Sequence, residues 1–556
     1  MFLDKMRDIF LKDRTTSFLL ILLLLIVSII SLSLIDLQSK LGVYYWDIFV
    51  YLGNALRFAG LGVGDQMLLP PLLPFLTSLF FRAGFVSENV VFILSGVLYV
   101  LGAVGLYLLL NERFNAFASF AGSIFFACIA LVIPWAVSGA TDVPAISFSI
   151  WAMFFTVRAI KNPRYYYIAF PLAAMAFLTR YTSGFIIILM LFYIILNKDY
   201  LKHLKNILIG IVLSAAVSTP FLIYFYRISG NAFPFINQMT STATGAVTTA
   251  NPGYNLDLLY YFKYIPNYIS STPLKSYSQI LTTSGPATLV SYLILIIITI
   301  GIIIYIYNIV SSVKKVNTNF SRINLLKFFS IIILGVILVL TYSKISYLVS
   351  VAILLVISFF IHDLIKQKQK DADLDVIFFA WFMMYFLFLS YHAVKVDRYI
   401  LTAMPALAYF LTLSISCISS KLKFKYNKFN LTSAILSVAV VVMMLSSAFY
   451  FIGEMPRDYY WIDDEKTAAE FLTDYDPDYQ SKVIVADRGP AFSWYLKKRV
   501  YTRIPRNFKT SEDFFHELET LKADYYIDVL KNPKMDIPGY EKIKTIGIIA
   551  IYKRIY

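Results

Sequence analysis

Residues 288–308 read TLVSYLILIIITIGIIIYIYN, a run of 21 residues without a charged side chain. About 20 consecutive apolar residues are enough for a helix to cross the hydrocarbon core of a bilayer. Similar runs recur along the first four-fifths of the chain. We expect a polytopic α-helical membrane protein with about thirteen transmembrane helices, at 17–36, 87–110, 117–135, 143–160, 165–179, 182–196, 207–226, 288–308, 326–343, 347–364, 376–391, 400–419 and 431–452.

The composition of the whole chain excludes several other classes. Of the 556 residues, 59% are hydrophobic and 15% are charged, and the formal net charge is +15. A soluble domain has roughly a quarter charged residues, and a disordered chain has low hydrophobicity. A nucleic-acid-binding protein carries its basic face on a water-exposed body. The positive charge therefore needs another explanation.

The distribution of the charges predicts the topology. Residues 454–556 hold 17 basic and 18 acidic residues, whereas the preceding residues hold 32 and 16. With the N-terminus inside, 22 of those 32 basic residues fall on the inner side and 10 on the outer side, as the positive-inside rule expects. Thirteen spans then place the C-terminal domain outside the cytoplasm. Both cysteines lie in spans, so this domain has no disulfide, which favours a prokaryotic plasma membrane.

We expect two domains. Residues 1–452 form the transmembrane domain, with long outer loops at 37–86 and 227–287, and residues 453–556 form a small soluble extracytoplasmic α/β domain. This second domain lacks a glycine-rich nucleotide loop, and we interpret it as an accessory domain for acceptor binding or packing, with His516 on its surface. Its expected elements are strands at 483–487, 500–504, 525–529 and near 546–552, and helices at 490–498 and 511–522.

The first outer loop contains a segment with helical periodicity. At 100° per residue, Asp47, Tyr51, Asn54 and, more loosely, Arg57 share one side, opposite an apolar side, which predicts an amphipathic helix in the membrane interface. A carboxylate at its N-terminal end is favoured by the helix dipole. A simple N-cap role for Asp47 is an equal alternative.

A few other outward-facing polar residues could contribute chemistry. Asp142 precedes a span in Thr141-Asp142-Val143-Pro144, where a structural cap is the simpler interpretation. Arg180 lies in a turn between two short spans. Charges near membrane depth are costly, although snorkelling explains many single ones. A lipid phosphate at this depth would need such groups around it, and the remaining candidates are His392, Lys395 and Arg398.

The second long outer loop is rich in small hydroxyl residues between Thr240 and Gly253, followed by a candidate interfacial helix at 258–264. This composition is typical of a mobile segment. A lid over the site and a plain flexible linker are equally compatible with it.

Together these motifs resemble the GT-C membrane glycosyltransferases that use polyprenyl-phosphate sugars, in the branch that contains the protein O-mannosyltransferases and the aminoarabinose transferases. The family often has a second acidic residue in the first outer loop. Here the nearest is Asp65, which leaves a metal site at Asp47 and Asp142 open. The oligosaccharyltransferase signature Trp-Trp-Asp is absent. The matching pieces are Asp47 with Arg57, Pro70-Pro71-Leu72-Leu73-Pro74, Thr141-Asp142-Val143-Pro144, Leu178-Thr179-Arg180-Tyr181, and His392-x-x-Lys395-x-x-Arg398-Tyr399 with Pro405.

The resemblance implies an enzyme that moves a sugar, a mannose-like hexose, from a polyprenyl or dolichyl phosphate to a hydroxyl of a protein, glycan or lipid acceptor on the outer face. Asp47 would be the general base of an inverting displacement, and Asp142 would orient the acceptor or sugar. No cofactor is required, although a divalent cation is compatible. The donor phosphate would be bound by Arg57, Arg180, His392, Lys395 and Arg398.

Two other classes of function share some of these features. A flippase or transporter of lipid-linked sugars would have the same spans and basic residues, but would not need a carboxylate at the outer face. A glycan polymerase or ligase would have the same location, but normally lacks a terminal soluble domain of this size.

Overall fold

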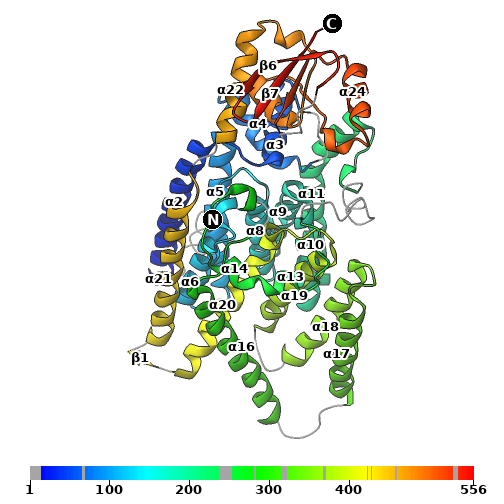
Figure 1. The fold of residues 1–556 in the computed structure, drawn as a ribbon. Helices are drawn as coiled ribbons and strands as arrows, with labels where there is room; N and C mark the ends of the chain where they lie inside the picture. The colour runs from blue at the N-terminus through cyan, green and yellow to red at the C-terminus, as the bar shows by residue number, and fades with distance from the viewer. Residues whose placement is uncertain are drawn as a thin grey trace. The chain divides into compact units, whose positions relative to one another are not determined.

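The computed structural model of the chain forms two compact units (Figure 1). The first comprises Met1–Leu34, Ser95–Val137 and Thr141–Pro456, and the second comprises Ile35–Leu94, Ser138–Ala140 and Arg457–Tyr556. The residues described within them are 14–64, 69–198, 200–236, 253–280, 283–315, 322–366, 371–422, 424–426, 429–457, 460–529 and 536–555.

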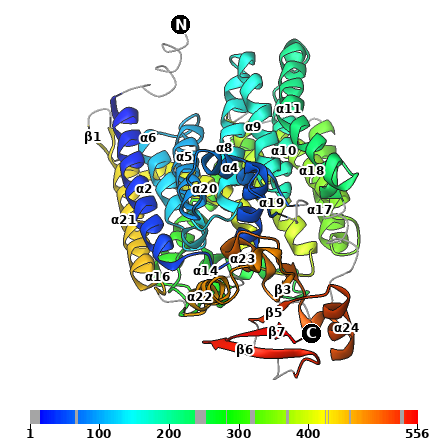
Figure 2. The same ribbon diagram turned by 90° about the horizontal axis from the view of Figure 1, so that it is seen from above.

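The first unit is almost entirely helical (Figures 1 and 2). Helices suit its apolar segments because a helix satisfies its own backbone polar groups where water is absent. The elements are α2 Arg14–Leu41 and α5 Asn89–Leu110, which run into the second unit, then α6 Ala116–Cys128, α7 Ile133–Ala136, α8 Asp142–Ala159, η1 Pro163–Tyr165, α9 Tyr166–Thr179, η2 Tyr181–Gly184, α10 Phe185–Leu196, α11 Tyr200–Ser229, α13 Tyr260–Lys263, α14 Ile265–Ile269, α15 Tyr277–Ile280, α16 Leu289–Lys315, α17 Arg322–Thr341, α18 Tyr347–Lys366, α19 Ala372–Tyr391, η3 Asp397–Ala403, α20 Met404–Leu422, the short strands β1 Lys425–Tyr426 and β2 Phe429–Asn430, and α21 Leu431–Glu454.

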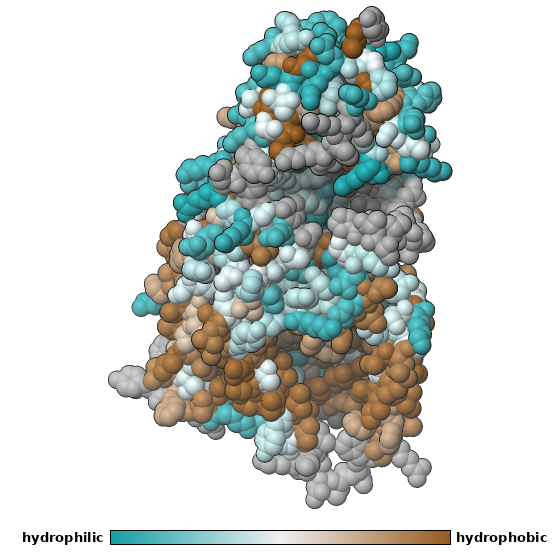
Figure 3. All heavy atoms as spheres, viewed as in Figure 1, coloured by the Kyte–Doolittle hydropathy of each residue, from teal (hydrophilic) through white to brown (hydrophobic). Residues whose placement is uncertain are grey.

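The helices of this unit differ sharply in how much of their apolar surface is covered. In the segment that contains α20, 83% of the most apolar stretch of 18 residues is buried inside the protein. In α17 the corresponding share is 6%. Hydrophobic side chains cover the surface where α16 and α17 run (Figure 3). Because a helix that is apolar all round and uncovered by protein is stable in lipid rather than water, these helices identify a membrane-facing surface.

Each of the thirteen segments expected to span the membrane contains a helix. Within the described residues, nine helices are long and apolar enough to cross a membrane by length and composition. The nine do not include α6, α8, α9 or α10, so the count of thirteen is not confirmed. The protein is a multi-span membrane protein. The expected interfacial helix at 258–264 is only the single turn α13, and it is followed by the five-residue helix α14, in which Pro266 lies in the first turn.

The second unit combines the first outer loop with the C-terminal residues. Its elements are α3 Trp46–Ala59, α4 Leu72–Arg82, α22 Tyr460–Tyr475, η4 Tyr479–Ser481, β3 Ile484–Ala486, α23 Gly489–Leu496, β4 Tyr501–Thr502, η5 Pro505–Asn507, α24 Ser511–Thr520, β5 Tyr525–Asp528, β6 Tyr540–Ile546 and β7 Ile549–Arg554. The single strand expected near 546–552 is therefore the hairpin β6–β7, because Gly547 and Ile548 form a two-residue turn.

A five-stranded sheet in the order β4-β3-β5-β7-β6 forms the centre of the α/β part, with β4, β3 and β5 parallel. Side chains alternate between its faces. Ile484 and Ile527 pack with α22 and α23 on one face, while Val485 and Tyr526 pack with α24 on the other. Both faces of the sheet are thus covered by helices, with α24 on one side and α22 and α23 on the other.

The apolar side of α3 packs against α23. Ile48, Phe49 and Leu52 share one buried core with Ala491 and Trp494. Residues 37–86, which we grouped with the transmembrane domain from the sequence, therefore form one compact unit with the α/β domain. The α/β domain thus has a packing role, because it holds the helix that carries Asp47.

A buried ion pair reinforces this packing. Arg488 lies 2.8 Å from the carboxylate of Glu465, which is fully buried. The same guanidinium lies 5.6 Å from the ring centre of Phe49 on α3 and 4.6 Å from that of Trp461 on α22. One side chain therefore contacts helices from both sequence regions of the unit.

We predict that Arg488→Ala destabilises the unit by about 3–5 kcal/mol, because it leaves the Glu465 carboxylate buried without its counter-ion. Thermal unfolding of the full-length protein in detergent measures the effect. Arg506→Ala is the matched control, since Arg506 is exposed on the same domain and we expect a change within about 0.5 kcal/mol. Equal melting temperatures for the two variants would contradict the anchoring role of Arg488.

Candidate functional site

Asp142 and Arg180 form an ion pair in the first unit. Asp142 is the first residue of α8, is 1% exposed, and its carboxylate lies 2.5 Å from the Arg180 guanidinium. Arg180 stands in extended backbone between α9 and η2, and it also donates to the Thr182 hydroxyl at 3.1 Å. Asp142 is therefore a buried counter-ion for Arg180.

A second arginine shares an aromatic neighbour with the first. The guanidinium groups of Arg180 and Arg398 each lie 5.8 Å from the ring centre of Tyr399. Arg398 is 8% exposed and also lies 4.9 Å from the ring centre of Trp135. The structure thus brings together Asp142, Arg180 and Arg398, three of the residues predicted from the sequence. We name this set, with Tyr399 and Trp135, the arginine cluster.

Lys395 and His392 lie in the same connection between α19 and η3, where they form hydrogen bonds with backbone groups of the connection and of the end of α19. The Lys395 ammonium donates to the carbonyl oxygens of Leu389 and Ser390 at 3.2 and 2.7 Å, and to that of His392. It thereby satisfies carbonyls at the end of α19. His392 Nδ1 accepts from the Val394 amide at 3.1 Å. Burial lowers the pKa of Lys395 to about 8 and also lowers the pKa of His392.

Asp397 has a structural role that the sequence did not reveal. Its carboxylate accepts hydrogen bonds from the hydroxyls of Tyr260 and Tyr268 at 2.8 and 3.1 Å, and from the Ser284 amide at 2.5 Å. These partners all belong to the second outer loop, which the carboxylate therefore fixes next to Arg398. The lid hypothesis concerned the loop at 227–287, of which residues 237–252 and 281–282 lie outside the described part of the chain.

Asp47 and Arg57 belong to the second unit. Asp47 is half-buried in the first turn of α3, as the periodicity predicted. Arg57 is in the last turn, where its guanidinium donates to the Gly64 carbonyl at 2.7 Å. Asp65, the alternative second acidic residue of this loop, lies outside the described residues.

The described residues show no arrangement that fits a metal ion. Within these parts of the chain, no group of three or more His, Cys, Asp or Glu side chains could hold one. Asp142, one of the two metal ligands considered from the sequence, faces Arg180 instead.

We predict that Asp397→Leu loosens the second outer loop, because it leaves the buried hydroxyls of Tyr260 and Tyr268 without their acceptor at a cost of about 1–3 kcal/mol each, and also frees the Ser284 amide. Limited proteolysis of the detergent-solubilised protein should show faster cleavage between residues 253 and 291. Asp257→Leu serves as the control in the same loop, because its partners, the Lys263 ammonium and the Leu259 amide, are exposed to solvent. If both variants resist protease as the wild type does, the anchoring role of Asp397 is wrong.

Comparisons with known proteins agree with the membrane fold. Residues 69–224 match the family model for dolichyl-phosphate-mannose-protein mannosyltransferase. Among solved structures, the chain is similar to ArnT from Cupriavidus metallidurans bound to undecaprenyl phosphate, with 11% identity, a TM-score of 0.58, and coverage of 96% of this chain and 97% of ArnT. The apo structure of that protein gives the same values.

A second similar structure is the oligosaccharyltransferase of Archaeoglobus fulgidus in its apo form. It is 12% identical, with a TM-score of 0.53, and the match covers 91% of this chain and 69% of the oligosaccharyltransferase. The search of curated protein sequences gave no match.

The chain therefore has a fold similar to those of ArnT and of the archaeal oligosaccharyltransferase, in agreement with the fold that the resemblance to the GT-C membrane glycosyltransferases implied. The match to the mannosyltransferase family model is confined to residues 69–224, and the ArnT-like fold is that of a multi-span helical protein with a small C-terminal sheet domain.

Proposed function

We propose that this protein is a membrane glycosyltransferase that transfers a sugar from a polyprenyl or dolichyl phosphate to a hydroxyl group of a protein, glycan or lipid. The observation that carries the proposal is the arginine cluster, which supplies two guanidinium groups at one aromatic ring in an ArnT-like fold. That the ArnT structure holds undecaprenyl phosphate supports a lipid phosphate as the donor carrier. We favour a hexose such as mannose as the sugar.

The arginine cluster suits the leaving group of such a reaction. Guanidinium groups form paired, charge-assisted hydrogen bonds with phosphate oxygens. The buried Asp142 carboxylate offsets part of the charge of Arg180 and fixes its position, so that the cation is already oriented when phosphate arrives. Lys395 positions the connection that leads to Arg398, because its ammonium donates hydrogen bonds to the backbone carbonyls at the start of that connection. His392 stabilises the same connection, because its Nδ1 accepts a hydrogen bond from the Val394 amide.

In the proposed reaction, the acceptor oxygen bonds to the anomeric carbon while the bond from that carbon to the phosphate oxygen breaks. The electron pair of the broken bond leaves with the polyprenyl phosphate, whose growing negative charge Arg180 and Arg398 stabilise. Asp47 takes the proton of the acceptor hydroxyl as a general base. A single displacement of this kind inverts the anomeric configuration. No nucleotide sugar is needed, because the donor is already activated in the membrane.

We further propose that the N-terminus is cytoplasmic and that the α/β domain and Asp47 face the opposite side, in a prokaryotic plasma membrane. The excess of basic residues in the inner connections supports this orientation.

The test of the function is a transfer assay with the purified full-length protein and synthetic polyprenyl-phosphate hexoses. We expect release of free polyprenyl phosphate that depends on an acceptor fraction prepared from membranes. Movement of intact lipid-linked sugar across vesicles without any release would instead establish a transporter.

We predict that Asp47→Asn lowers kcat by about 10²–10⁴-fold, because the variant loses the base while it keeps the shape of the side chain. Binding of the polyprenyl-phosphate sugar should remain unchanged. The matched control is Asp36→Asn, which removes an exposed carboxylate paired with Lys40 at 2.6 Å. Full transfer activity in a folded Asp47→Asn variant would refute the role of Asp47.

We predict that affinity for polyprenyl phosphate falls as the pH rises through about 8, because Lys395 then loses its proton and with it one of the three hydrogen bonds that position the connection leading to Arg398. Phosphate monoesters complete their own second ionisation near pH 6, below this window. Titration of the wild type and of Lys395→Met between pH 7 and 9.5 checks this. The variant should show weaker binding without the step, and a wild type with no step would contradict the assignment.

A further inference from the structure

The second unit contains a hollow of about 340 Å³. Among the described residues that line it, the charged ones are all positive. The residues are Arg57, Gly62, Val63, Gly64 and Arg499, so that two arginines and small residues form the wall without an acidic side chain. Arg57 comes from the last turn of α3, and Arg499 comes from the connection between α23 and β4. We name this hollow the two-arginine pocket.

The glycine-rich wall of the pocket is fixed by backbone constraints. Gly62 has φ +116°, which side chains other than glycine rarely permit. Gly64 lies so close to α3 that an added Cβ would be 2.7 Å from the Cα of Asn54 and 2.8 Å from the Gly53 carbonyl oxygen. The loop after α3 therefore folds back along the helix, and the Arg57 guanidinium is tied to it through the Gly64 carbonyl.

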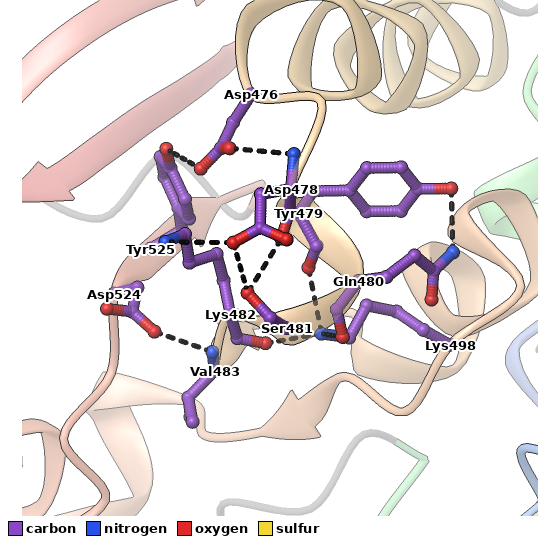
Figure 4. Close-up of polar contacts among 10 residues, drawn as sticks. All are labelled: Asp476, Asp478, Tyr479, Gln480, Ser481, Lys482, Val483, Lys498, Asp524 and Tyr525. Atoms are coloured by element: carbon purple, nitrogen blue, oxygen red, sulfur yellow. Dashed lines mark hydrogen bonds and ion pairs between the residues drawn. The ribbon is translucent and has the colours of Figure 1, made fainter.

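The other wall is fixed by the residue next to Arg499. The Lys498 ammonium donates to the carbonyl oxygens of Tyr479 and Gln480, both at 3.0 Å, and to that of Lys482 (Figure 4). These bonds anchor the connection between α23 and β4. The Arg499 guanidinium lies 4.7 Å from the ring centre of Tyr501, which limits its orientations. Lys498 is thus used for structure, whereas Arg499 faces the pocket.

Both guanidinium groups are available to an anion. Among the described residues, neither Arg57 nor Arg499 forms an ion pair with a carboxylate, whereas the neighbouring Arg503 pairs with Glu517 at 2.7 Å. Two guanidinium groups without counter-ions repel each other, and an oxyanion between them relieves that repulsion and accepts their paired donors. The pocket therefore favours a phosphate or carboxylate group.

The position of the pocket on α3 argues against the donor phosphate as its occupant. Gly64 contacts α3 at Gly53 and Asn54, six to seven residues beyond Asp47, which is ~10 Å along the helix axis. If Asp47 is the base, the leaving phosphate oxygen lies only ~7 Å away, through the acceptor oxygen and the anomeric carbon. The occupant of the pocket is therefore an anionic group other than the donor phosphate.

From this geometry we infer that the two-arginine pocket binds a phosphate or carboxylate carried by the acceptor, so that the enzyme glycosylates an anionic glycan or lipid. This inference rests on the proposed function. It gives Arg57 and Arg499 a role in acceptor specificity, and it separates Arg57 from the donor phosphate site to which the family resemblance had assigned it.

The experiment measures binding of two probes to the full-length protein in detergent: glucose 1-phosphate, which represents an anionic acceptor group, and undecaprenyl phosphate, which represents the donor. We expect Arg499→Gln and Arg57→Gln each to weaken glucose 1-phosphate binding at least about tenfold and to leave undecaprenyl phosphate binding unchanged. Arg506→Gln should change neither affinity, and Arg499→Lys should restore part of the glucose 1-phosphate affinity.

Three outcomes would overturn the inference. The first is the absence of saturable glucose 1-phosphate binding to the wild type. The second is equal affinity in the wild type and in folded Arg499→Gln. The third is a parallel loss of undecaprenyl phosphate binding, which would assign the pocket to the donor. Because these measurements need no turnover, they are independent of the transfer assay, and a failure of the proposed function alone would appear as intact probe binding without transfer.

Discussion

The packing of α3 against α23 is the contact on which the proposed chemistry depends. A helix in a membrane interface has one apolar side, and that side must be covered by lipid or by protein. Here it is covered by Ala491 and Trp494, and Arg488 adds a contact with Phe49. The residue proposed as general base is therefore held by a folded α/β domain rather than by a loop. Such support is what a precisely placed carboxylate requires.

Charge burial imposes the second constraint. Cations placed near the membrane are expensive unless they are paired or hydrogen-bonded. The first unit meets this cost in two ways. Asp142 neutralises Arg180, while Lys395 gives its donors to the end of α19. Arg180 and Arg398 also share the ring of Tyr399. These neighbouring side chains thus hold the two guanidinium groups in place for an anion. Asp397 fixes the second outer loop next to Arg398.

Local patterns predicted much of the fold, whereas long-range contacts were not predictable. Hydropathy located the apolar helices, and periodicity located α3 with Asp47 in its first turn. The helix α22 was not predicted, because six of its 16 residues are charged and interrupt its apolar pattern. No local signal indicated that Asp397 would meet Tyr260, 137 residues away, or that Lys395 would bond to carbonyls instead of facing a ligand. Nor did the sequence reveal that Arg57 and Arg499 line one pocket.

The most direct test of the account is the anomeric configuration of the transferred sugar. A product made by the purified protein from a polyprenyl-phosphate hexose of known configuration can be assigned by NMR from its anomeric proton. A single displacement with Asp47 as the base predicts complete inversion relative to the donor. Retention would require a covalent sugar–enzyme intermediate or two successive displacements, and it would contradict the mechanism proposed for this protein.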